Sequence, residues 1–76
     1  MNLATQDDHE SFLFAIRNAA KNHAFAMKQH AWIKELEYER EITIQSEQAL
    51  RAGVDVGDIK AAIRKGRREG MEEGAE

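Results

Sequence analysis

The chain has 76 residues with 11 basic and 14 acidic side chains, three histidines, no cysteine and no proline, and its formal charge is −3 at pH 7. Without cysteine, neither disulfides nor thiolate zinc sites can stabilise so small a domain, and the acidic balance argues against general attraction to nucleic acid or anionic membranes. A chain of this size buries little apolar surface, so the composition predicts association with itself or with another protein.

The sequence offers no membrane-spanning or secretory signal. No apolar run approaches the length of a membrane span, and Asp7, Asp8 and Glu10 stand where a signal peptide would need positive charge. These acids instead suit the first turns of a helix, where the helix dipole favours negative charge. We therefore expect a cytoplasmic protein.

The first predicted element is one long helix over about residues 6–51. Proline is absent and all five glycines lie beyond residue 52, so nothing in this stretch breaks a helix. Thr5 is the expected N-cap, with Asp8 at the third helical position of a capping-box variant. A turn near residues 22–23 or 43–46 stays open as an alternative, because the predicted helix is far longer than an ordinary one.

A shorter second helix is predicted over about residues 56–69. Gly53 supplies the left-handed position that commonly ends a helix, and Asp55 supplies a new N-cap. Apolar side chains of the second helix are expected to fold back against the end of the first, namely Ile59, Ala62 and Ile63. Glycine then recurs every fourth residue among charges, so we expect fraying, with a single helical domain over residues 1–70 and a flexible charged tail over 71–76.

The long predicted helix carries an apolar stripe with the alternating steps of four and three that a coiled-coil seam requires. The stripe consists of Phe12, Ile16, Ala19, His23, Ala26, His30 and Ile33. We expect this seam to join two copies of the chain, so the predicted fold is all-α, a helical hairpin or a four-helix arrangement as a homodimer. The alternative is a monomeric three-helix bundle with a break near residue 30.

His23, His30 and Glu37 follow one another at intervals of seven residues. On one helix this spacing separates neighbouring positions by about 10 Å, which is too far for a single chain to chelate a metal. Between two chains the same residues would form a metal site or a pH-sensitive layer. Ordinary hydrogen-bonded seam histidines are the favoured interpretation, so we predict neither a metal nor a cofactor.

Catalytic constellations are missing from the sequence. The two serines, Ser11 and Ser46, are not in helical register with a histidine, and no glycine-rich phosphate loop follows a strand. We therefore predict that the protein is not an enzyme and has no small-molecule substrate. An alternating run of carboxylates is expected to form a solvated acidic band or a docking surface for a basic partner, and it consists of Glu35, Glu37, Glu39 and Glu41.

Large apolar side chains gather in the middle of the predicted long helix. Such side chains dominate protein interfaces when they do not belong to a core, and they are Phe25, Trp32, Ile33, Leu36 and Tyr38. We interpret them as the contacts through which the protein binds and regulates, inhibits or escorts a partner protein. Their alternative role is the core of the homodimer itself.

One short segment resembles the core of a helix-turn-helix unit. Ala49 takes the small position in the first helix, Gly53 the turn, and Val54 and Ile59 the two apolar anchors. The resemblance implies, as a second hypothesis, a dimeric nucleic-acid-binding regulator that uses residues 49–68. Its contacts would be Lys60, Arg64, Lys65, Arg67 and Arg68.

Overall fold

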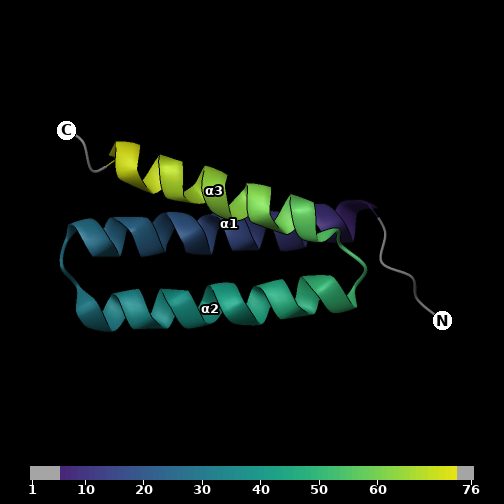
Figure 1. The fold of residues 1–76 in the computed structure, drawn as a ribbon, viewed down its shortest axis with the longest axis horizontal. Coiled ribbons are helices and arrows are strands. Elements are labelled where there is room, and N and C mark those ends of the chain that lie inside the picture. The colour runs from purple at the N-terminus through teal and green to yellow at the C-terminus, as the bar shows by residue number, and fades with distance from the viewer. Residues whose placement is uncertain (1–5, 74–76) are drawn as a thin grey trace.

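The computed structural model describes residues 6–73, and within this range it contains three α-helices and no strand (Figure 1). Helix α1 spans Gln6–Lys28, α2 spans Trp32–Arg51 and α3 spans Val56–Glu73. The all-helical prediction is confirmed. The prediction of one unbroken helix over residues 6–51 is wrong, because a turn separates α1 from α2, and the break lies near residue 30 as the three-helix alternative expects.

The turn between α1 and α2 is a Schellman motif built on a histidine. The Ala31 amide donates to the Ala26 carbonyl at 3.0 Å and the His30 amide donates to the Met27 carbonyl at 3.2 Å, which satisfies carbonyls at the end of α1. His30 has a φ of 55°, the left-handed conformation that this motif needs. Glycine usually fills the position, but histidine is among the residues that adopt it more readily than most.

The turn between α2 and α3 repeats the same motif with a glycine. The Val54 amide donates to the Ala49 carbonyl at 3.0 Å, and Gly53 has a φ of 90°. The Asp55 carboxylate then accepts a hydrogen bond from the Gly57 amide at 2.9 Å, as an N-cap does. Both the left-handed glycine and the aspartate cap predicted from the sequence are confirmed. The predicted cap of α1, Thr5, lies outside the described residues.

Helix α1 lies at the centre of the fold. Figure 1 shows α2 running antiparallel along α1, and α3 returning over α1 in the direction of α1 itself. Each outer helix packs extensively on α1, whereas α2 and α3 make few contacts with each other. The second predicted helix therefore packs mainly on the first part of the expected long helix, and Ile59 also shares a cluster with Ala49 near the end of that stretch, as the sequence predicted.

The core consists mostly of small side chains. Ile16, Ala49, Val54 and Ile59 form one buried cluster beneath the Gly53 turn. A second cluster extends it along α1 and α2, and contains Ala19, Ala20 and Ile42. Among the described residues, Ile16 is the one large side chain that is fully buried. So thin a core leaves most of the large apolar side chains on the outside.

Two glycines of α3 lie directly against α1. A Cβ atom at Gly66 would overlap the Arg17 carbonyl oxygen, and one at Gly70 would overlap the Lys21 carbonyl oxygen. Small residues at this four-residue spacing let two helix backbones approach closely. The prediction of a frayed glycine repeat is therefore wrong for Gly66 and Gly70, and α3 extends to Glu73 instead of ending at residue 69. Residues 74–76 of the predicted flexible tail lie outside the described residues.

Polar contacts fasten the middle and the C-terminal end of α1 to α3. Arg17 Nε donates to Glu69 Oε1 at 2.6 Å, and Lys28 Nζ donates to the Met71 carbonyl at 2.5 Å. The hydrogen bond from Arg17 lowers the pKa of the Glu69 carboxyl, desolvation opposes this, and the positive charges of Arg17 and nearby lysines add to the lowering. No helix in the described part of the chain is long and apolar enough to cross a membrane.

Candidate functional site

The most exposed large apolar side chains lie at the beginning of α2, beside the His30 turn. Trp32 is 75% exposed, Ile33 74% and Leu36 68%. All three belong to the partner-binding set predicted from the sequence. The same set included Phe25, which is exposed on α1, and Tyr38, which is half-buried on α2.

Trp32 lies between two surface hollows. The first, of about 410 Å³, is named here the Trp32 cavity and is lined by His23, Met27, Trp32, Glu35, Leu36 and Glu39. The second, of about 390 Å³, is lined by His30, Ala31, Trp32, Ile33 and Lys34. Phe25 and Tyr38 line neither hollow, so the structure brings together three of the five predicted partner contacts.

Local sequence explains why Trp32 is held outside. The His30 turn reverses the chain immediately before Trp32, which places this residue in the first turn of α2 at the tip of the α1–α2 hairpin. Ala31 occupies the N-cap position of α2 and offers no side-chain hydrogen bond. The beginning of α2 therefore lacks the polar cap that most helices have, and an indole stands beside it.

The charges around the Trp32 cavity have one sign. Glu35 and Glu39 line it and no lysine or arginine does, while His23 on α1 completes the polar part of the lining. The sequence grouped these two glutamates with Glu37 and Glu41 in one acidic band. Of these four, Glu35 and Glu39 line the cavity, because residues four apart lie on the same face of a helix.

Sequence reasoning missed Met27 and His23 as parts of this surface. Met27 is half exposed and joins Trp32 and Leu36 in the cavity, although it comes from α1. The signal was present in the sequence, since Met27 belongs to an apolar stripe of α1. Met27 and Trp32 line the same cavity because the chain reverses at His30, between the two residues.

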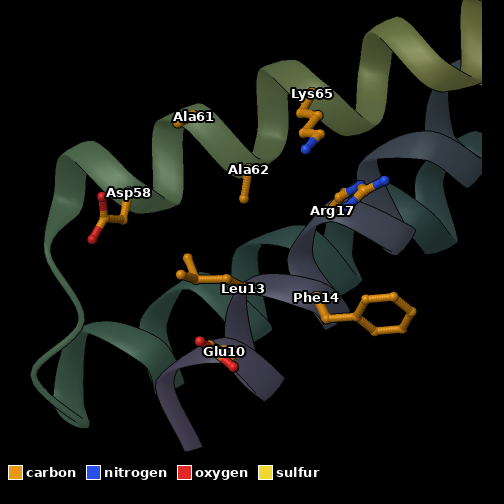
Figure 2. A pocket seen from close by; sticks show the side chains of 8 residues that line it. All are labelled: Glu10, Leu13, Phe14, Arg17, Asp58, Ala61, Ala62 and Lys65. Atoms are coloured by element: carbon orange, nitrogen blue, oxygen red, sulfur yellow. The ribbon is translucent and has the colours of Figure 1, made fainter. Parts of the chain in front are cut away.

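A third hollow is a groove between α1 and α3, and it encloses about 410 Å³ (Figure 2). Leu13 of α1 and Ala62 of α3 point toward each other across it, whereas the ring of Phe14 points away from α3. Glu10 and Asp58 lie toward one end, and Arg17 and Lys65 toward the other. Charges of both signs thus line this groove, and Arg17 is already paired with Glu69.

The seam predicted between two chains lies largely within one chain. Ile16, Ala19 and Ala26 are buried, and the first two pack in clusters with α2 residues of the same chain. His30 belongs to the turn and Ile33 to α2, so they do not continue the stripe of α1. The homodimer itself stays a prediction, and it would need another surface.

The predicted line of His23, His30 and Glu37 is likewise broken. His23 lies on α1, His30 in the turn and Glu37 on α2, so the three residues do not share one helix face. The described residues contain no group of three or more histidine, aspartate or glutamate side chains that could hold a metal ion.

The five predicted nucleic-acid contacts all lie exposed on α3, and they are Lys60, Arg64, Lys65, Arg67 and Arg68. Lys65 lines the groove between α1 and α3. The anchors of the helix-turn-helix resemblance, Ala49, Val54 and Ile59, pack in one cluster as the resemblance implies. The helices on either side of the turn nevertheless make few contacts, because α3 packs on α1.

Comparison of the chain with known protein families, with characterised proteins and with solved structures gave no match.

Proposed function

We propose that the protein is a non-enzymatic interaction module that binds a partner protein through the Trp32 cavity. One observation supports this proposal above the others: the core of the described chain is built from alanine and a few β-branched side chains, while its single tryptophan is three-quarters exposed. Burying a large aromatic side chain gives a protein more stabilisation than almost any other choice. A tryptophan held outside so thin a core is therefore better explained by binding than by stability.

The shape and charge of the cavity suggest the chemistry of the partner. Met27, Trp32 and Leu36 offer apolar contact, and the flexible methionine can adapt to side chains of different shape. Glu35 and Glu39 at the cavity favour a partner whose apolar anchor is flanked by lysine or arginine. We expect the partner to insert one or two apolar side chains beside Trp32. Through that contact the protein would regulate, inhibit or escort its partner.

A photo-crosslinking residue at position 32 tests the proposal. We expect it to form a covalent adduct with a different protein in cells that produce the chain, and a matched residue at position 50, on the exposed Leu50 of the same helix, to form none. Binding of the purified partner should then weaken about 30-fold or more in Trp32→Ala, as for an interface hot spot. Its circular dichroism spectrum should not change, because Trp32 lies outside the core. Equal binding by Trp32→Ala and the parent chain would contradict the proposal.

A second candidate function is nucleic-acid binding through α3. The observation in its favour is the cluster of exposed lysines and arginines on one helix that follows a left-handed glycine turn. Against it, α3 lies along α1, whereas a helix-turn-helix unit packs its two helices on each other at a steep angle. This candidate predicts binding to a DNA duplex that falls steeply between 50 and 200 mM salt and is lost in the triple glutamine variant of Arg64, Arg67 and Arg68.

A further inference from the structure

The outer face of α2 carries a line of four exposed side chains, named here the outer stripe: Ile33, Glu37, Arg40 and Ile44. Their spacing of four, three and four residues places them along one side of the helix, as in a coiled-coil seam. From this stripe we infer that two copies of the chain associate through antiparallel pairing of their α2 helices. The inference does not rest on the Trp32 cavity, and Trp32 itself lies about 110° around α2 from the centre of the stripe.

Nothing in the described part of the chain covers the outer stripe. Helix α2 packs on α1 through its opposite face, where Ile42 and Ala49 are buried, and at about 100° per residue the stripe lies roughly half a turn away from them. Figure 1 shows α2 along one edge of the molecule, with α3 over α1. Ile33 remains 74% exposed and Ile44 45% exposed. The stripe is thus an unpartnered helix face with apolar residues at both ends and charges between them.

The order of residues in the stripe is self-complementary in one direction. In an antiparallel pair that sets Ile33 of one subunit against Ile44 of the other, Glu37 faces Arg40 of the partner subunit. Two-fold symmetry repeats both contacts, so the pair has apolar contacts on the outside and two opposite-charge contacts in the middle. Within the described chain Arg40 forms no ion pair, and Glu37 is joined only to exposed Lys34 at 3.4 Å.

Other pairings of the same helices bring like charges together. A parallel pair sets each residue of the seam against its own copy, so that Glu37 faces glutamate and Arg40 faces arginine. An antiparallel pair that overlaps the full length of α2 sets Glu37 against Glu47 of the partner subunit. Like-charge contacts in an interface are unfavourable, so charge selects the register with Ile33 against Ile44.

The pairing supplies the apolar burial that the single chain lacks. Two helices in contact over about 14 residues form an interface smaller than the roughly 1,200 Å² at which the range for stable specific complexes begins. We therefore expect a reversible dimer with a dissociation constant on the order of micromolar. Such a dimer carries two Trp32 cavities and so two copies of the proposed binding site.

The solution mass of the full chain tests the inference. Light-scattering chromatography from about 1 to 500 μM should show a mass that rises from one chain to two. A mass of one chain at the highest concentration would overturn the inference. Ile33→Lys should raise the dissociation constant about 100-fold, since the substitution acts twice in a symmetric dimer. Leu50→Lys, on α2 but outside the stripe, is the matched control and should leave the dimer unchanged; equal effects of the two variants would overturn the interface.

A charge exchange tests the register. Glu37→Arg and Arg40→Glu should each raise the dissociation constant about tenfold or more, because each places like charges in the middle of the pair. The double variant, with both substitutions in every chain, restores opposite charges and should return the dissociation constant to within about threefold of the parent. Failure of the double variant to restore the dimer, with circular dichroism showing intact helices in all variants, would overturn the antiparallel pairing.

Discussion

The two ends of the α1–α2 hairpin use the same turn for opposite purposes. At one end the Gly53 turn leads into Val54 and Ile59, which are buried with Ile16 and Ala49. At the other end the His30 turn leads into Trp32 and Ile33, which are exposed. Backbone hydrogen bonding is alike in both turns, so the turn motif does not decide whether the following side chains build a core. The presence of α3 decides it, because α3 begins directly after the Gly53 turn.

The largest expected difference between the two ends comes from one substitution made at each. Ile59→Ala removes a buried side chain and should lower the free energy of unfolding by about 3 kcal/mol. Ile33→Ala removes an exposed side chain and should change that free energy by less than about 0.5 kcal/mol. Urea unfolding of both variants at a concentration that keeps the chain monomeric measures the difference. A loss of similar size at both sites would mean that the His30 end is also core.

A smaller effect is expected where α3 approaches α1. Gly66→Ala places a methyl group against the Arg17 carbonyl and should lower the free energy of unfolding by about 2 kcal/mol, since backbone atoms have to move. Gly57→Ala is the comparison variant, because its methyl group meets the Asp55 carboxylate that caps α3 and no backbone atom. We expect it to lower the thermal midpoint less than Gly66→Ala does, by no more than the loss of one cap; an equal decrease in both variants would contradict the close helix contact.

The two turns themselves should respond in opposite directions. Gly53→Ala forces a side chain into a left-handed conformation and should lower the free energy of unfolding by about 1 kcal/mol. His30→Gly removes the steric cost of holding a side chain in the same left-handed conformation, so it should raise the free energy of unfolding by about 0.5 kcal/mol. Thermal unfolding of the two variants shows the signs. A decrease in His30→Gly would indicate that the histidine side chain stabilises the turn through contacts of its own.

The smallest expected effect concerns the Arg17–Glu69 pair, which lies between the two ends. The pKa of Glu69 is lowered in the folded chain, so its contribution to stability is present above about pH 4.3, the ordinary pKa of a glutamate. That contribution is lost as the pH falls through the lower folded-state pKa. The thermal midpoint of the parent chain should therefore exceed that of Glu69→Gln at pH 7, and the gap should close toward pH 3. A gap that widens on acidification would contradict the pairing.

Local signals in the sequence predicted much of the fold. Gly53, Asp55 and the helix-forming run that starts at Gln6 mark boundaries that the structure confirms, because each acts through its own backbone or cap. The break at His30 was not predictable in this way, since a histidine only occasionally takes the left-handed conformation of a glycine. Gly66 and Gly70 were misjudged for a different reason, because their burial depends on α1, more than 40 positions earlier in the chain.

The candidate site was predicted in part for similar reasons. Trp32, Ile33 and Leu36 were identified by size and apolar character, and their exposure agrees with a role in binding without testing it. Met27 and His23 joined them only through the reversal at His30. Because of the same reversal, α2 packs on the stripe of α1 that was predicted to join two copies of the chain. Ile16 and Ala19 are therefore buried within one chain.

The central position of α1 has a consequence for how the molecule opens. Since α2 and α3 make few contacts with each other, either outer helix can detach while the other remains packed on α1. Native-state hydrogen exchange should therefore find the slowest amides in α1, with α2 and α3 exchanging through two separate openings. Helix α2 also joins α1 through a short local turn, whereas α3 reaches α1 only after the intervening helix is in place. Contacts so distant in sequence form late, so we expect the α1–α2 hairpin to fold first and the docking of α3 to limit the folding rate.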